Sequence, residues 1–251
     1  MAQTATLQRN VDRIRGLLMA FGLDRQIRIA YDEWNLRSWH HPDVDTAPLG
    51  TDEFIRARAK ADINATYTMA DAVFNGCFLN MLLRNADIVG MAAYAPAVNT
   101  RGSIYVHDRG IVKRTTWHVF YLYTHLMGDQ VLDSWTDGAP VATKVTKYDE
   151  TYDVEMIDAV ATRFSQSGDI AVSLVNKEPE KAHEVEINLP AGYRLDRMTT
   201  LRGHDKDDYN DVDRDAVLPE DTTGDARTAG ATLKITLSPH SVNIVTLKAE
   251  K

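Results

Sequence analysis

Two adjacent carboxylates, Asp32 and Glu33, directly follow an apolar run, residues 26–31, whose side chains alternate as they do in a β-strand. A carboxylate on a rigid element can be aimed at a reacting atom, as a nucleophile, acid or base must be. In enzymes built on a barrel of parallel strands, the catalytic groups lie at the carboxyl ends of the strands, so Glu33 is expected at the mouth of such a barrel. The alternative is an acidic pair that is solvated or caps the strand.

The residues after the acidic pair combine aromatic rings with amide and imidazole groups. Trp34 and Trp39 could line a pocket and stack on the faces of sugar rings. His40 and His41 could line the same pocket, and Asn35 could hydrogen-bond to hydroxyls. The two histidines could also suggest a metal ion. Adjacent side chains diverge, however, and no cysteine or spaced third ligand accompanies them, so the sequence predicts no metal and no cofactor.

The first 140 residues alternate between helical and extended patterns. Apolar residues recur in steps of three and four in the helical segments, and they alternate or run together in the extended ones. The expected order is a helix over residues 7–21, a strand over 26–32, a long helix over 54–81, a strand over 88–94 and a helix over 116–127, with loops over 40–50 and 96–114. This alternation predicts an α/β fold with parallel strands.

From about residue 141 the pattern changes to short alternating runs, at 170–175, 185–189, 233–237 and 242–247. Turn-rich acidic segments, notably 203–230, separate these runs. Regularly spaced short strands with such breaks predict an antiparallel β-sandwich of about 100 residues. We place the boundary within 136–145, which divides the chain into residues 1–140 and 141–251.

Two parallel strands alone do not make a domain, because their edges stay unpaired and their apolar faces are only partly covered. A closed (β/α)8 barrel takes about 250 residues. The α/β part of this chain has only 140. It is therefore expected to be the end of a larger fold.

Charge and cysteine content limit the classes of function. The net charge is −8, and an acidic surface repels a phosphate backbone, so nucleic acid is not expected as a partner. No apolar stretch approaches the roughly 20 residues that span a bilayer, and residues 1–20 lack the pattern of a signal peptide. The single Cys77 cannot form an internal disulfide and is expected to be a buried apolar side chain. These features predict a cytoplasmic protein without membrane contact.

The segment from Asp32 to Asn35 resembles the nucleophile motif of the α-L-arabinofuranosidases of glycoside hydrolase family 51. Further segments resemble that family in the same order along the chain, at residues 91–102, 110–114, 116–123, 127–129 and 238–242. One such motif would be weak evidence. Several in register over nearly the whole chain are specific.

The resemblance implies a fold in which a (β/α)8 barrel precedes a β-sandwich. This chain would supply the last two β/α units of the barrel, followed by the antiparallel β-sandwich. The implied activity is the removal of terminal α-L-arabinofuranosyl residues from arabinose-containing oligo- or polysaccharides, with retention of configuration. Glu33, at the end of the seventh barrel strand, would be the nucleophile, and residues 88–94 would form the eighth strand.

The family's acid/base is a glutamate that directly follows an asparagine on the fourth strand. No Asn-Glu pair occurs in these 251 residues. The resemblance therefore implies a truncated chain that lacks the acid/base and is inactive on its own.

The resemblance also bears on substrate contacts. Asn99, in the loop after the eighth strand, would contact the sugar, as would Trp34, Asn35 and Trp39, the last as a wall of the pocket. Asp32 is expected to have a structural role, because alternate side chains of a strand point to opposite faces and Asp32 would project away from Glu33.

The resemblance suggests a homo-oligomer, or a missing N-terminal fragment, as the protein partner. A second hypothesis comes from a different class of protein: a non-catalytic remnant whose sandwich serves as a carbohydrate-binding or interaction module.

Overall fold

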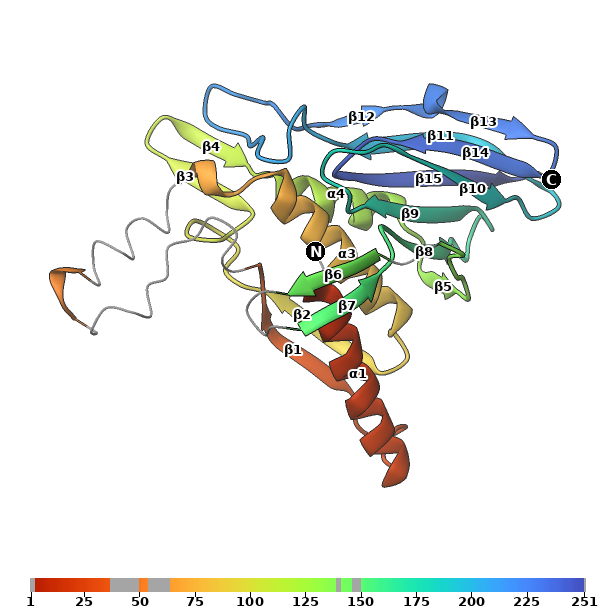
Figure 1. Cartoon of the computed structure of the whole chain (residues 1–251), viewed down its shortest axis with the longest axis horizontal. Coiled ribbons are helices and arrows are strands. Elements are labelled where there is room, and N and C mark those ends of the chain that lie inside the picture. The colour runs from red at the N-terminus through yellow and green to blue at the C-terminus, as the bar shows by residue number, and fades with distance from the viewer. Residues whose placement is uncertain (1–2, 37–49, 54–63, 139–140, 146–149, 251) are drawn as a thin grey trace.

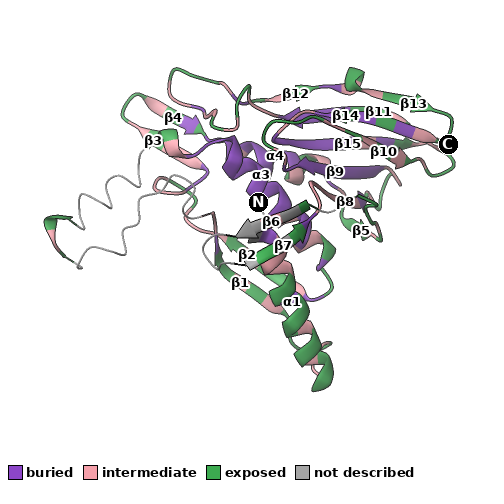
Figure 2. Ribbon diagram, in the orientation of Figure 1, coloured by how far each residue is buried: buried purple, intermediate pink, exposed green. Residues whose placement is uncertain are grey.

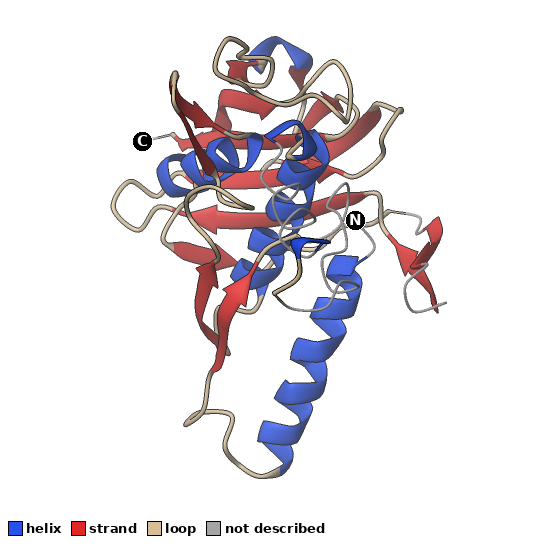
Figure 3. Ribbon diagram, turned by 90° about the vertical axis from the view of Figure 1, so that its left-hand side faces the viewer, coloured by secondary structure: helices blue, strands red, loops and turns tan. Residues whose placement is uncertain are grey.

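The computed structural model describes residues 3–36, 50–53, 64–138, 141–145 and 150–250. A small parallel pair of strands with its helices lies beside two larger antiparallel sheets (Figure 1). The helix nearest the N-terminus, α1 (Gln3–Ala20), projects away from these sheets, as the turned view in Figure 3 also shows. The part of the chain that the structure describes contains no helix long and apolar enough to cross a membrane.

The parallel pair consists of β1 (Ile29–Trp34) and β2 (Val89–Tyr94). Helix α3 (Met69–Arg84) connects the two strands, and α4 (Thr115–Leu126) follows the second. The predicted alternation of helices with parallel strands is thus confirmed. Rings from β1 and α3 form the core between them, and Phe78 lies at its centre.

The predicted helix over 54–81 was wrong about where the helix begins. Residues 54–63 lie outside the described part of the chain, and Asn64–Thr66 forms a separate 3-10 turn, η2. Thr68 is extended and caps α3 in a capping box: its hydroxyl accepts from the Ala70 N–H, and the Asp71 carboxylate accepts from the Thr68 N–H. Apolar periodicity continues across this break, so spacing alone concealed a Thr-x-x-Asp start signal.

The predicted loop over 96–114 contains a hairpin. Its strands are β3 (Ile104–His107) and β4 (Gly110–Lys113), paired in antiparallel fashion. Gly110 adopts φ 157°, in the region that favours glycine. The turn therefore needs a glycine at this position.

Most of the remaining strands form a sandwich of two antiparallel sheets, as predicted. The apolar side chains between the sheets include Leu174, Met198 and Leu237. The larger sheet has the spatial order β12 (Pro219–Asp221), β11 (Tyr193–Leu201), β15 (Ser241–Ala249), β9 (Ile170–Asn176), β8 (Ile157–Arg163) and β5 (Gln130–Leu132). The smaller sheet has the order β10 (His183–Asn188), β14 (Thr232–Leu237) and β13 (Ala226–Ala229), with the 3-10 turn η4 (Thr223–Asp225) before β13.

Helices α3 and α4 cover the outer face of the larger sheet. Every residue of β9 is buried, and Figure 2 shows this strand and α3 in purple throughout most of their length. Cys77 of α3 packs in this interface, where burial raises the pKa of its thiol to about 12. The expectation of a buried, unpaired cysteine is confirmed.

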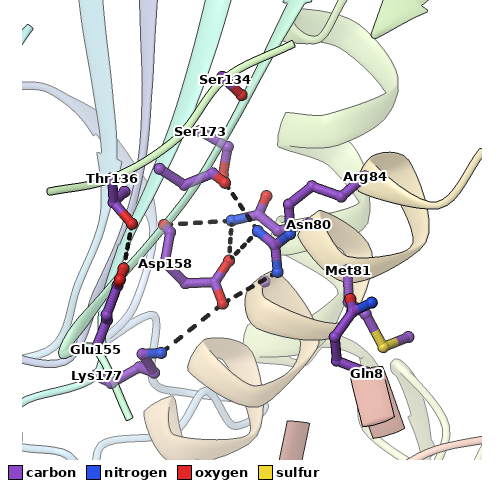
Figure 4. Close-up of polar contacts among 12 residues, drawn as sticks. Gln8, Asn80, Met81, Arg84, Ser134, Thr136, Glu155, Asp158, Ser173 and Lys177 are labelled. Carbon is purple, nitrogen blue, oxygen red and sulfur yellow. Dashed lines mark hydrogen bonds and ion pairs between the residues drawn. The ribbon is translucent and has the colours of Figure 1, made fainter. Parts of the chain in front are cut away.

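A buried polar network joins the same helices to the sheet (Figure 4). Asp158 of β8 accepts hydrogen bonds from Arg84 (2.7 Å) and Asn80 (3.0 Å) of α3, and Lys177 lies 3.8 Å from its other oxygen. The hydroxyl of Tyr123 on α4 contacts Asn80 at 2.6 Å, and burial raises the pKa of this phenol well above its ordinary value. Helices and sheet are therefore connected by charge as well as by apolar packing.

The division of the chain after residue 140 stays a prediction. Strand β5, which precedes that point, pairs with β8 in the larger sheet. Strands β6 (Val141–Val145) and β7 (Glu150–Val154), which follow it, form a separate hairpin. A strand from before residue 140 is thus part of the larger sheet of the sandwich.

Candidate active site

A β-bulge interrupts β1 at the two carboxylates. Tyr31 pairs with Ala92 and Trp34 pairs with Tyr94, so three steps along β1 match two steps along β2. The extra residue breaks the regular alternation of side chains. Tyr31 and Trp34 consequently both contact Phe78 of α3, with ring centroids at 5.4 and 4.1 Å. The expectation that Asp32 and Glu33 project to opposite faces assumed a regular strand. Strand β1 does not keep the regular alternation at these two residues.

Glu33 lies within this bulge, at the carboxyl end of β1, and its side chain is exposed. Its backbone N–H donates to the Asp32 carboxylate at 3.0 Å, so Asp32 holds the bulge in place. In the described residues, the Glu33 carboxylate itself has no hydrogen bond or ion pair. Bulges often redirect a side chain next to an active site, and this one carries an exposed carboxylate on a rigid strand.

Trp34 belongs to the core. Its ring is only 7% exposed, stacks on Phe78 and meets the edge of Tyr94 at 5.0 Å. The predicted contact between Trp34 and a sugar does not fit this burial. The ring instead anchors the end of β1 directly after Glu33.

Asn35 connects the end of β1 to the loop after β2. Its side-chain amide donates to the carbonyls of Ala95 (3.2 Å) and Arg101 (2.8 Å), and the Tyr94 hydroxyl donates to the same Arg101 carbonyl at 3.2 Å. These bonds occupy the amide hydrogens that were expected to reach substrate hydroxyls. We name residues 95–102 the β2 loop.

Asn99 shapes the turn within the β2 loop. It adopts φ 51°, and Thr100 after it adopts φ 43°. The Asn99 side-chain oxygen accepts from the Val106 N–H at 2.7 Å, which ties the turn to β3. The predicted sugar contact of Asn99 stays a prediction. Trp39, His40 and His41 lie outside the described residues.

Arg114 is a further residue of the site that sequence reasoning missed. It is fully buried and lies over the ring of Tyr67 at 3.7 Å. Its guanidinium donates to the carbonyls of Thr100 (2.8 Å) and Gly102 (2.9 Å) in the β2 loop. Arg114 is also the N-cap of α4, where a cation opposes the helix dipole. An arginine at this unfavourable position indicates that its charge is needed for another contact. This was the signal in the sequence that could have identified it.

Gly102 allows the β2 loop to close on itself. A Cβ at this position would lie 2.5 Å from the Ala97 carbonyl carbon and 2.6 Å from the Val98 nitrogen, both backbone atoms. We therefore expect Gly102→Ala to open the loop and to lower the free energy of unfolding by about 1–3 kcal/mol, as overpacking does. Thermal unfolding measures the change.

Gly16→Ala on α1 is the matched control for this substitution. A Cβ there meets no atom within 4 Å, and alanine in a helix interior is favoured over glycine by about 0.5–1 kcal/mol. The control should unfold at the wild-type temperature or above. If the two variants unfold alike, close packing at Gly102 does not hold the loop.

The described residues contain no group of three or more histidine, cysteine, aspartate or glutamate side chains placed to hold a metal ion. The site offers the exposed carboxylates of Asp32 and Glu33 on a strand end. Asn35, two residues after Glu33, holds the β2 loop from one side, and Arg114 holds it from another.

Comparison with protein families places most of the chain in one known domain. The family model described as "Alpha-L-arabinofuranosidase C-terminal domain" matches residues 32–241. An exo-α-(1→6)-L-arabinofuranosidase of Bifidobacterium longum is 31% identical over 230 residues, which are 88% of this chain and 42% of the relative. The α-L-arabinofuranosidase C of Emericella nidulans is 30% identical over 177 residues, 67% of this chain and 31% of the relative. The chain thus spans less than half the length of these relatives.

Solved structures share the fold. The family 51 α-L-arabinofuranosidase from Thermotoga petrophila aligns with a TM-score of 0.78 at 18% identity, over 98% of this chain and 49% of that one. A family 51 α-L-arabinofuranosidase from Bifidobacterium longum aligns with a TM-score of 0.75 at 24% identity, over 98% of this chain and 47% of that one. At these identities the likeness concerns the fold alone.

Proposed function

Because the chain belongs to the α-L-arabinofuranosidases of glycoside hydrolase family 51, as their C-terminal portion, we propose that it forms part of a retaining glycosidase. The substrates would be arabinose-containing oligo- or polysaccharides, from which terminal α-L-arabinofuranosyl residues are removed. Glu33 is the nucleophile in this proposal.

The observation that carries the proposal is the placement of Glu33. An exposed carboxylate without a partner in the described residues lies at a strand's carboxyl end, fixed by the Asp32 bond before it and the buried Trp34 ring after it. Such a group can attack the anomeric carbon of a sugar and displace the leaving oxygen. The product is a covalent glycosyl-enzyme, which water then hydrolyses.

A second carboxyl group must protonate the leaving oxygen and then remove a proton from the attacking water. No Asn-Glu pair is present in the 251 residues. We therefore propose that the acid/base comes from a segment outside this sequence, and that β1 and β2 are the seventh and eighth strands of a barrel which that segment completes.

Exposed apolar side chains support an incomplete barrel. Ile14, Leu17 and Phe21 on and just after α1 are 40%, 61% and 75% exposed, and Met91 on β2 is 55% exposed. Surfaces of this kind mark places where another part of a protein packs. The partner in this proposal is an N-terminal segment with the first six β/α units.

Covalent labelling tests the assignment of Glu33. The chain is combined with an N-terminal barrel segment from a family 51 relative and treated with a mechanism-based arabinofuranosyl inactivator. Peptide mapping should find the label on Glu33, because the neighbouring exposed carboxylate, Asp32, already accepts a hydrogen bond from the Glu33 N–H. Glu33→Ala should abolish labelling.

Asp32→Asn is the matched control. It keeps the shape of the side chain and removes a charge, and we expect it to reduce stability while leaving the label on Glu33. A label on Asp32, or on the added segment alone, would contradict the assignment.

A further inference from the structure

A sandwich loop, residues 203–217 between β11 and β12, leaves its sheet and contacts the start of α3. The Asp208 carbonyl accepts from the Met69 N–H at 2.8 Å, and the Lys206 carbonyl accepts from the Ala70 N–H at 3.1 Å. The first N–H groups of a helix have no partner within the helix. The sandwich therefore supplies acceptors to Met69 and Ala70 at the start of α3, in addition to the Thr68 cap.

Within this sandwich loop, Asn210 is 1% exposed and makes bonds in three directions. Its side-chain amide donates to the carbonyls of Lys113 (3.0 Å) and Val217 (2.8 Å), and its side-chain oxygen accepts from the Val217 N–H at 2.8 Å. Its backbone carbonyl accepts from the Asn64 amide at 2.7 Å. One asparagine thus connects the sandwich loop to β4 and to η2.

The connection continues to the β2 loop. The Asn64 side-chain oxygen accepts from the Arg114 Nε at 2.8 Å, and Arg114 in turn donates to the carbonyls of Thr100 and Gly102. All three linking residues, Asn210, Asn64 and Arg114, are buried, and Asn210 makes its link to Asn64 through its backbone carbonyl. An unbroken series of buried hydrogen bonds therefore runs from the sandwich to the loop beside Glu33.

The β2 loop is held from its other side by Asn35, two residues after Glu33. A second contact reinforces the sandwich side, where Arg109 at the turn of the hairpin forms an ion pair with Asp213 at 2.7 Å. The loop that borders the carboxylate is consequently fixed between β1 and the sandwich.

We propose that Asn210 is a positioning residue for the proposed active site, through which the sandwich sets the conformation of the β2 loop. The proposal rests on the proposed function for its catalytic meaning. Removing the Asn210 side chain leaves the carbonyls of Lys113 and Val217 and the Val217 N–H without their partner. A buried polar group without a partner lowers stability by more than the net contribution of one hydrogen bond. Asn210→Ala keeps the backbone carbonyl that accepts from Asn64, so the proposed route to the β2 loop is a shift of the sandwich loop away from β4 and η2 once the side-chain bonds are lost.

Hydrogen exchange of the 251-residue chain tests this coupling without any need for activity. In Asn210→Ala, exchange should rise by about 10-fold at the amides that close the β2 loop and its flanks, those of Gly102, Ile104 and Arg114. Arg114→Lys keeps the charge but loses the planar fork, so it should produce the same local rise if Asn210→Ala does not fold.

Asn176→Ala is the matched control, in a different turn at the same end of the larger sheet. Asn176 is equally buried, donates to the carbonyls of Lys181 (3.0 Å) and Ser238 (2.8 Å), and accepts from the Glu178 N–H at 3.0 Å. Its loss should leave exchange in the β2 loop at the wild-type rate. Unchanged exchange in Asn210→Ala, or an equal rise in both variants, would overturn the proposal.

The labelling of Glu33 separates this inference from the proposed function. Asn210→Ala should slow labelling by about 10-fold or more, because misplacing a reacting group by about 1 Å can cost 10²-fold, whereas Asn176→Ala should not. If Glu33 is never labelled but exchange responds as expected, the coupling holds and the assigned chemistry fails. If labelling succeeds and exchange does not respond, the coupling is wrong.

Discussion

The purified 251-residue chain is expected to hydrolyse an aryl α-L-arabinofuranoside about 10²–10⁴-fold more slowly than the same chain completed by an N-terminal barrel segment. Glu33 is the proposed nucleophile, and the sequence has no Asn-Glu pair, the motif expected to supply the acid that protonates the leaving oxygen. The substrate also loses the positioning that the rest of a barrel would give it.

Release of the phenol, followed by absorbance, measures this difference. Three samples are compared: the chain alone, the chain with the added segment, and the Glu33→Gln chain with the same segment. Only the second should turn over at a substantial rate. Robust turnover by the chain alone that Glu33→Gln abolishes would show that an acid/base is present in these 251 residues.

The sequence was most informative where structure is set locally. The periodicity of residues 116–127 predicted α4 within one residue at each end. The alternating run at 242–247 lies within β15. Helical and strand periods reflect which face of one element is buried. They need no knowledge of distant partners, so a single sequence reveals them.

Features that depend on distant pairing could not be predicted in this way. The bulge at Asp32 and Glu33 exists only in the register of β1 against β2, nearly 60 residues further along the chain. The same register turns Trp34 inward to Phe78. The sequence shows a strand that ends in Asp-Glu-Trp, and regular alternation would not place Trp34 on the same side as Tyr31, where both rings contact Phe78.

The polar groups behind the site were hidden for a related reason. Asn64, Arg114 and Asn210 come from three separate segments, and each has the composition of an ordinary loop or cap. Their burial becomes visible only when the sandwich lies against the helices. The exposed carboxylate could be predicted because a strand end is a local feature, whereas its support could not.

The interface between helices and sandwich predicts how the chain unfolds. Val73 and Leu122 from the two helices and Ile244 from β15 belong to one apolar core. The larger sheet of the sandwich therefore shares a buried face with the α/β part. We expect the two parts to unfold together, whereas independent folding of residues 141–251 would predict two transitions.

Asp158→Ala is expected to lower the free energy of unfolding by about 2–4 kcal/mol, because it leaves the charges of Arg84 and Lys177 unpaired in a buried interface. The carboxyl side chain is 11% exposed, and that of Lys177 is 6% exposed. Arg84 is 32% exposed, so water offsets part of the loss. Urea unfolding measures the change.

Glu186→Ala is the matched control for Asp158→Ala. Glu186 pairs with Lys234 at 2.7 Å, the same distance as Asp158 with Arg84, but both side chains are about half exposed. A surface pair of this kind contributes at most about 1 kcal/mol. Both variants remove one carboxylate from an ion pair, so the difference between their free energies of unfolding reports the effect of burial.

All four tryptophans precede residue 141, so fluorescence reports the α/β part, while far-ultraviolet circular dichroism also reports the sandwich. The two signals should change at the same urea concentration in the wild-type chain, and Asp158→Ala should move both to lower urea by the same amount. If only the fluorescence transition moves, the sandwich is independent of the helices. If Asp158→Ala costs no more than Glu186→Ala, the buried network does not join the two parts.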